Sequence, residues 1–439
     1  MTTNNLTSPT FREAFLFWLK LGFISFGGPA GQIAIMHDFL VDKKKWISNS
    51  RFMHALNYCM LLPGPEAQQL AIYTGWLLHG KKGGVVAGVL FVLPSMLMLA
   101  MLSMLYVMFG NVPLVGALLT GLKAAVMAII LTALIRIARK AWVSRFHIIL
   151  SLISFVLIYW WKLPFTIVII GAILLAVLYA RLIQPQTNQR DDRIANDDEQ
   201  GYFIHRDSMH IQTVSPVRNA LKVFFTCFIL WCLPVVLIFL TGSEVAFWKS
   251  LILFFTEAAF VTFGGAYAVL PFVAQVSVEK FQWLSAAQML DGLALGETTP
   301  GPLIMVLAFV GFMAGYHQYQ AGLLAGIAGL CITTWYTFLP GFFFILAGAP
   351  FIERSKDNLT LNKALSVVSA VVVGVIAGLT VYLSEKVLFI TSFGVLQPDY
   401  WHWMWFIISV VALVRFKINL IVWIGISLLM GLIRFFIEG

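Results

Sequence analysis

A pattern of glycine and proline occurs twice in this chain of 439 residues, at a constant separation of 237 positions. The first copy contains Ser25-Phe26-Gly27-Gly28 and Pro63-Gly64-Pro65, and the second contains Thr262-Phe263-Gly264-Gly265 and Pro300-Gly301-Pro302. No insertion or deletion separates the copies between these motifs. The sequence therefore contains an internal duplication, and each copy interrupts its apolar segments at two matching places.

The composition predicts a polytopic membrane protein. Hydrophobic residues make up 60% of the chain and charged residues only 11%, which is too little polar surface for a soluble protein of this length. The formal charge of +9 is carried by short loops, such as those at 136–145 and 415–417, so a cytoplasmic bias of basic loops explains it better than a nucleic-acid partner. No cleaved signal peptide is expected before the first apolar segment.

The positive charge of the loop at 37–51 indicates how the first apolar segments are arranged in the membrane. Simple counting of crossings places this loop outside, although it contains Lys43, Lys44 and Lys45. If segments 11–36 and 52–78 are re-entrant hairpins that turn back at their glycine and proline breaks, the loop becomes cytoplasmic. An odd number of crossings then separates the two copies. We therefore predict an all-α membrane protein made of two inverted homologous halves with broken or re-entrant helices.

The expected division of the chain follows the duplication. Residues 1–183 form an N-terminal membrane half, residues 184–218 a polar cytoplasmic linker, and residues 219–439 a C-terminal membrane half. The linker carries clustered charges and lacks apolar periodicity. Four dispersed cysteines show no metal-ligand spacing, so neither a metal site nor another cofactor is expected.

Broken helices at corresponding positions predict a binding site for an anion. The helix that restarts after a break has free N–H groups and the positive end of the helix dipole at its start. Glycine lets the backbone approach a ligand, and proline suits the first turn of the restarting helix. The residues expected to line the site from these motifs and nearby polar positions are Gly27, Gly28, Pro29, Asn57, Pro63, Gly64, Pro65, Gln68, Gly264, Gly265, Pro300, Gly301 and Pro302.

Ionisable residues within apolar segments are further candidates, because each is costly to insert in a membrane and needs a partner or a wet cavity. Lys20 and Lys123 are expected to attract the substrate, whereas Glu66, Glu257 and Glu297 are expected to couple transport to protons. Lys20 and Glu257 are 237 positions apart, so the two copies differ in charge there. Snorkelling to the membrane surface, or structural pairing of the carboxylates, remains open as the alternative.

The ordered combination of motifs resembles the chromate ion transporter family, in its long-chain form with two homologous halves. The resemblance is carried by Phe26-Gly27-Gly28-Pro29, Pro63-Gly64-Pro65, the stretch from Gly83 to Pro94, Gly121-Leu122-Lys123-Ala124-Ala125-Val126, Phe263-Gly264-Gly265, Pro300-Gly301-Pro302 and Val373-Gly374. The second copy departs from the first at Ala266, where Pro29 has its counterpart, and at Leu303, where Glu66 has its counterpart. Roles assigned to Pro29 or Glu66 therefore do not extend to the second copy.

The resemblance implies a multi-pass protein of the bacterial inner membrane. Its expected function is to export chromate by using the proton motive force, which would confer chromate resistance. Sulfate is the expected competitor because it is also a tetrahedral dianion. Protons and the lipid bilayer are the other expected partners, and a homodimer is left open.

Two alternatives remain at this stage. The first is a transporter of sulfate or another small anion. The second is an intramembrane lipid-phosphate phosphatase, which would need an arginine or a nucleophile just beyond the Pro-Gly motif. Glu66-Ala67-Gln68 and Leu303-Ile304-Met305 stand there instead, so we expect the chain not to be an enzyme.

Overall fold

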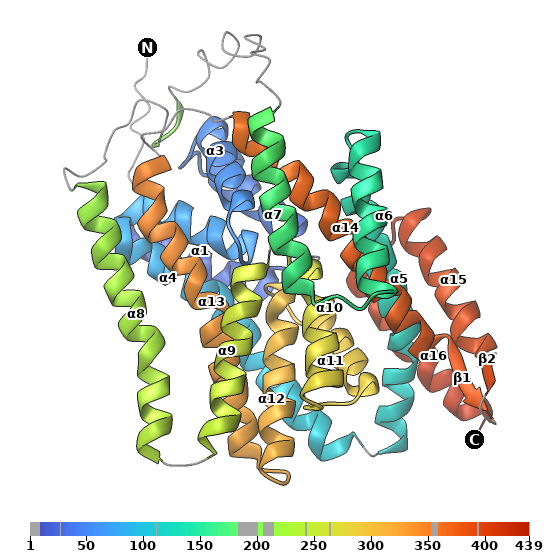
Figure 1. Ribbon diagram of the computed structural model, residues 1–439. Helices are drawn as coiled ribbons and strands as arrows, with labels where there is room; N and C mark the ends of the chain where they lie inside the picture. Colours follow the sequence, from blue (N-terminus) through green and yellow to red (C-terminus); the bar gives the residue numbers. More distant parts are fainter. Residues whose placement is uncertain are drawn as a thin grey trace.

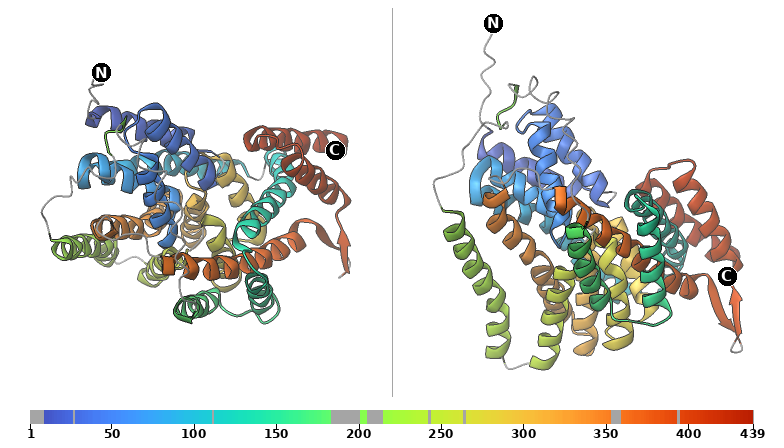
Figure 2. Two further views of the ribbon diagram at one scale, coloured as in Figure 1. Left: turned by 90° about the horizontal axis from the view of Figure 1, so that it is seen from above. Right: turned by 45° about the horizontal axis from the view of Figure 1, so that its top comes forward.

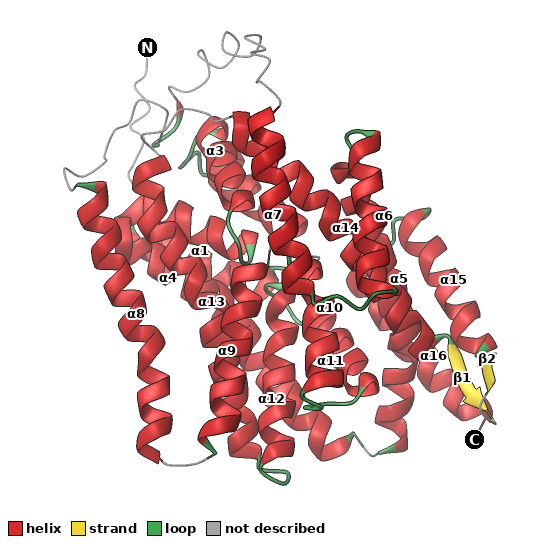
Figure 3. Cartoon of the chain, viewed as in Figure 1, coloured by secondary structure: helices red, strands yellow, loops and turns green. Residues whose placement is uncertain are grey.

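The structure is a computed structural model that describes residues 9–26, 28–110, 112–182, 201–204, 215–241, 244–262, 265–352, 359–392 and 395–438. Nearly all of these residues are helical (Figure 3), and the one sheet is a short antiparallel hairpin of β1 (Phe389–Ser392) and β2 (Val395–Pro398). The predicted all-α fold is confirmed. Most of the predicted linker lies outside the described residues.

Within the described residues, the N-terminal half contains seven α-helices. They are α1 (Phe11–Ile24), α2 (Gly28–His37), α3 (Asn49–Leu61), α4 (Glu66–Phe109), α5 (Pro113–Ala141), α6 (Arg145–Tyr159) and α7 (Phe165–Leu182), with a π-helical turn η1 (Asp38–Lys43) after α2. Helix α4 bends sharply where His79 and Gly80 leave helical geometry, with φ of 62° at Gly80. It therefore acts as two helices joined end to end.

The C-terminal half repeats this order after the additional helix α8 (Pro216–Thr241). Its elements are α9 (Val245–Val261), α10 (Ala266–Gln275), η3 (Val276–Lys280), α11 (Ala286–Thr298), η4 (Leu303–Met305), α12 (Val306–Gln318), α13 (Leu323–Ile352), α14 (Leu359–Val387), α15 (Tyr400–Val414) and α16 (Leu420–Glu438). The α12–α13 turn corresponds to the bend in α4. The duplication in the sequence is thus a duplication of structure.

The helix breaks fall at the duplicated motifs. Helix α1 ends just before the first Gly-Gly, and α3 ends just before the first Pro-Gly-Pro. With 14 residues at about 1.5 Å each, α1 is about 21 Å long, which is short of the ~30 Å apolar thickness of a bilayer. The tips of these hairpins meet the tips of the α9–α10 and α11–α12 hairpins in the middle of the molecule (Figure 1). Segments 11–36 and 52–78 are therefore each divided into two helical parts at their breaks, and their re-entry from one side of the membrane stays a prediction.

Long helices cross the molecule around these hairpins. Within the described residues, six helices are long and apolar enough to span a membrane: α4, α5, α8, α13, α14 and α16. The second part of α4 runs toward the bottom of Figure 1 and α13 runs away from it, as inverted halves require. The protein is therefore a multi-pass membrane protein with inverted repeats.

The two halves are intertwined by their longest matching helices. Helices α5 and α14 have 29 residues each and begin and end 246 positions apart. Helix α5 packs against α15 and α16 of the other half, whereas α14 packs against α6 and α7 (Figure 2). Each half is thus held by the other, and α5 and α14 both pass beside the hairpin tips.

Candidate functional site

The hairpin tips of the two halves are joined by a reciprocal pair of backbone hydrogen bonds. The N–H of Gly64 donates to the carbonyl of Thr262 at 2.7 Å, and the N–H of Gly301 donates to the carbonyl of Ser25 at 2.7 Å. Each bond joins one half's Pro-Gly-Pro turn to the residue just before the other half's Phe-Gly-Gly motif. The side-chain amide of Gln32 also donates to the Gly301 carbonyl at 2.6 Å. The duplicated motifs therefore build one buried junction on a pseudo-two-fold axis.

A cavity of about 1100 Å³ lies beside this junction. Its lining comes from the starts of α2, α4 and α10, from the C-terminal half of α5, from α14 and from the turn between α15 and α16. These elements belong to both halves, so the cavity lies where the two halves meet. This position is where transporters built from inverted repeats place their substrate site.

Two of the helix starts expose backbone to the cavity. Gly28 has φ of 73° and Gly265 has φ of 95°, a region that disfavours residues with a Cβ. A Cβ built at either position would meet no atom within 4 Å, so space is open beside both backbones. The first-turn N–H groups of α2 and α10 have no intrahelical acceptor and carry the positive end of the dipole. An anion in the cavity can approach these ends closely.

Four basic side chains add full positive charge to the cavity. Arg136, Arg139 and Lys140 come from the last turns of α5, and Lys417 comes from the α15–α16 turn. All four are exposed, and within the described residues none has a carboxylate oxygen within 4 Å. The cavity is therefore strongly electropositive.

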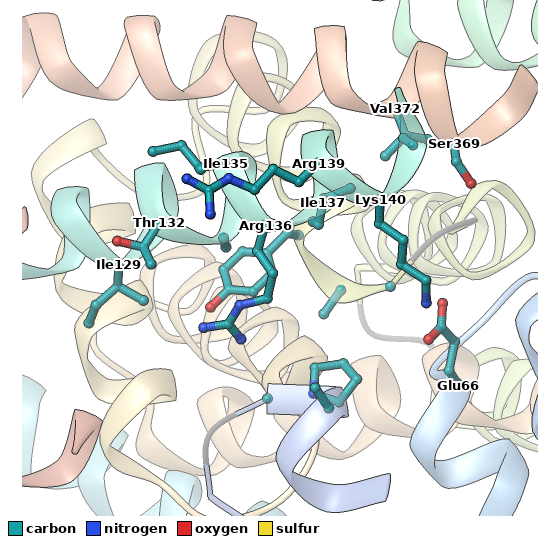
Figure 4. A pocket seen from close by; sticks show the side chains of 18 of the residues that line it. Glu66, Ile129, Thr132, Ile135, Arg136, Ile137, Arg139, Lys140, Ser369 and Val372 are labelled. Atoms are coloured by element: carbon teal, nitrogen blue, oxygen red, sulfur yellow. The ribbon is translucent and has the colours of Figure 1, made fainter. Parts of the chain in front are cut away.

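Glu66 is the carboxylate within the cavity lining. It is the first residue of α4, where the helix dipole favours negative charge, and its side chain is partly buried. Lys140 extends from α5 toward Glu66 (Figure 4). The one carboxylate of the lining therefore lies on the same side of the cavity as the Lys140 ammonium group.

Glu297 lies just behind the cavity wall. It is 9% exposed, and the hydroxyl of Tyr267, a lining residue at the start of α10, donates to its Oε1 at 2.8 Å. Glu257 differs, because it is exposed on α9 and accepts a hydrogen bond from Thr166 at 2.7 Å. Of the three predicted coupling carboxylates, two are at the cavity and one is on the outer surface.

The profile of the chromate transporter family matches this chain twice, at residues 12–177 and 249–432. The chain belongs to that family. The chromate transport protein of Pseudomonas aeruginosa is 32% identical over 394 residues, which cover 88% of this chain and 84% of that protein. The chromate transport protein of Cupriavidus metallidurans is 26% identical, covering 87% and 84% of the two chains.

A shorter relative matches only part of the chain. An uncharacterized transporter of Bacillus subtilis is 30% identical over 120 residues, which cover 27% of this chain and 67% of that protein. No solved structure is significantly similar. The described part of this chain also has no group of three metal-ligating side chains close enough to hold a metal ion.

The predicted site residues of this chain fall into separate groups. Gly28, Pro29, Gly265 and Glu66 line the cavity. A second group is buried at the junction behind the lining: Pro63, Gly64, Pro65, Gln68, Pro300, Gly301 and Pro302. Gln68 is fully buried there, and neither polar atom of its side chain has a partner among the described residues. Gly27 and Gly264 lie outside the described residues.

Three predicted polar residues lie away from the cavity. Lys20 is exposed on α1 and Asn57 is exposed on α3. Lys123 is held by Asp291 in a largely buried ion pair of 3.3 Å. The helix start that follows Pro300-Gly301-Pro302, at η4, is buried and does not reach the lining.

The cations that give the cavity its positive charge were not predicted from the sequence as site residues. Arg136, Arg139 and Lys140 were assigned to a cytoplasmic loop, but α5 continues to Ala141 and turns these residues toward the hairpin tips. Their spacing of three and four residues places them along one side of a helix. This spacing, directly after an apolar segment that contains Lys123 and Thr132, is the signal that could have identified them.

Proposed function

We propose that this chain exports chromate from the cytoplasm across the inner membrane by using the proton motive force, and thereby confers chromate resistance. The supporting observation is the electropositive cavity between two exposed helix starts and the cations of α5. A compact dianion is matched by this combination, because backbone N–H groups can donate hydrogen bonds to its oxygens and Arg136 and Lys140 balance its charge. Relatives named for chromate transport support the choice of anion.

The direction of export follows from the orientation proposed for the chain. The loop after Arg139 and Lys140 is basic, and basic loops are retained in the cytoplasm. The cavity would then open to the cytoplasm and load anions from there. With the cell interior negative, the potential favours outward movement of each negative charge by about 2.3 kcal/mol per 100 mV. The membrane potential therefore favours the outward movement of a dianion by twice that free energy.

Proton coupling is assigned to Glu66, with Glu297 as a second candidate. Glu66 and Lys140 lie in the same cavity lining, so gain or loss of a proton at Glu66 changes the charge that an anion meets beside Lys140. The proton occupancy of Glu66 therefore sets how strongly the cavity holds an anion. Glu297 affects the same wall through its hydrogen bond with Tyr267.

Transport in inverted membrane vesicles tests this proposal. Vesicles containing the protein should accumulate chromate when their lumen is acidic and electrically positive, and external sulfate should compete. Vesicles that keep a verified gradient but take up no chromate would contradict the proposal. If chromate uptake is absent while sulfate is taken up, the alternative of a transporter for another small anion holds.

A further inference from the structure

A buried cluster of polar side chains lies outside the cavity lining. Lys123 on α5 and Asp291 on α11 form an ion pair of 3.3 Å, with side chains 23% and 8% exposed. The hydroxyl of Tyr106 on α4 donates to the second oxygen of Asp291 at 2.9 Å. Three elements from both halves are tied together by this cluster. None of its residues lines the cavity.

The inverted repeat gives Lys123 a counterpart in the cavity. Because α5 and α14 have equal lengths and run 246 positions apart, Lys123 corresponds to Ser369, which lines the cavity (Figure 4). The α6–α7 and α15–α16 hairpins are also equivalent, since α6 and α15 both have 15 residues. Lys162 and Lys417 occupy the same place in their turns, with φ of 49° and 51°.

These correspondences place the counterparts of the cavity lining on the opposite side of the hairpin tips. There, Lys123 and Lys162 take the places that Ser369 and Lys417 have in the open cavity. The places of Arg136 and Arg139 are taken by Tyr382 and Glu385, and the Tyr159 hydroxyl donates to Glu385. Lys386 takes the place of Lys140, so this side has three cations and one carboxylate, whereas the lining of the open cavity has four cations and one carboxylate.

We propose that Lys123 is a second binding station for the oxyanion, on the exit side, and that Asp291 occupies this station while the exit is closed. The inference rests on the proposed function, since it concerns the same substrate. A carboxylate and a tetrahedral oxyanion present similar oxygens to an ammonium group, so they exclude one another at Lys123. An ammonium group that loses its buried partner needs a new anion or water. Opening the exit would therefore offer Lys123 to the substrate.

Thiol labelling at one matched pair of positions tests this assignment. In a variant whose own cysteines are replaced, Val372→Cys reports on the open cavity and Val126→Cys on its closed counterpart, because Val126 and Val372 are also 246 positions apart. The reagent is a membrane-impermeant maleimide, applied to spheroplasts for Val126→Cys and to inverted vesicles for Val372→Cys. Sulfate is the probe, because chromate oxidises thiols.

We expect slow labelling of Val126→Cys and a rise of roughly tenfold in its rate when Asp291→Asn removes the partner of Lys123. Sulfate should slow that faster labelling, and Lys123→Gln should abolish the protection. Tyr106→Phe loosens the same cluster without leaving an unpaired charge, so it should raise the rate in the same direction if Asp291→Asn does not insert. A rate unchanged in both variants, or protection that survives Lys123→Gln, would overturn the proposal.

Labelling of Val372→Cys distinguishes a failure of the exit station from a failure of the proposed transport function. Sulfate protection of Val372→Cys without protection of Val126→Cys would remove the exit station and leave the cavity as the transport site. Protection at neither position would overturn both proposals.

Discussion

Gly64 and Thr262, which belong to different halves and are 198 positions apart, are joined by a backbone hydrogen bond of 2.7 Å, and Gly301 and Ser25 repeat this bond in the reverse direction. Because each bond needs a glycine with positive φ at its donor, the Pro-Gly-Pro turns are structural parts of the junction. The neighbouring helix starts and α5 supply the cavity lining instead. This separation of roles leads to four predictions.

Gly301→Ala should destabilise the protein. A Cβ at residue 301 would lie 2.6 Å from the Cβ of Ser95, and φ of 99° is unfavourable for alanine. We expect a loss of about 2 kcal/mol or more, seen as a lower midpoint of thermal unfolding in detergent. Gly116→Ala is the matched control, because a Cβ there meets nothing within 4 Å inside helix α5. Equal midpoints for the two variants would contradict the structural role of the junction.

Gly28→Ala should impair substrate binding more than folding. The new methyl group would enter the open space of the cavity, so its structural cost is limited to the unfavourable φ, about 1 to 2 kcal/mol. It would also keep an anion away from the start of α2. We expect the chromate concentration for half-maximal uptake to rise about tenfold, consistent with the loss of one charge-assisted contact. A variant with wild-type half-saturation would remove this helix start from the site.

Arg136→Gln and Lys140→Gln should each weaken chromate binding. A hydrogen bond to a charged group contributes about 1.5 to 3 kcal/mol, so half-saturation should rise at least about tenfold. Lys20→Gln is the control, since Lys20 is exposed on α1 and does not line the cavity. If Lys20→Gln has the larger effect, the original prediction of Lys20 as a substrate residue is restored and the assignment to α5 fails.

Glu66→Gln should separate substrate binding from proton coupling. The neutral amide no longer competes for Lys140, so chromate binding should be kept or strengthened. Uptake should respond to an imposed electrical potential but lose its response to a pH gradient. Glu257→Gln should keep both responses, because Glu257 is on the outer surface. A Glu66→Gln variant that still follows the pH gradient would leave Glu297 as the coupling candidate.

The main features of the fold were predictable because glycine and proline act locally. The positive φ values of Gly28, Gly64, Gly265 and Gly301 coincide with the duplicated motifs, and the basic residues at 43–45 predict a first hairpin that returns to its own side. These signals require no knowledge of packing. They were sufficient to predict two inverted halves with broken helices.

The side-chain composition of the site was less predictable, because it depends on which face of each helix meets the other half. Lys20 and Asn57 lie on helices that border the site, yet both are turned outward. Lys123 is paired with Asp291, 168 positions later, and such a partner follows only from the packing of α5 on α11. Arg136 and Lys140 belong to the cavity because the other half's α15 and α16 hold α5 beside the hairpin tips.

Chromate uptake into inverted vesicles tests whether chromate passes through the cavity beside the junction. Wild-type protein should accumulate chromate when the lumen is acidic and positive, and sulfate should reduce the uptake. The double variant Arg136→Gln/Lys140→Gln should be inserted normally but take up no more chromate than vesicles without the protein. Full uptake by this double variant, or no uptake by the wild-type protein under a verified gradient, would show that chromate does not use this cavity.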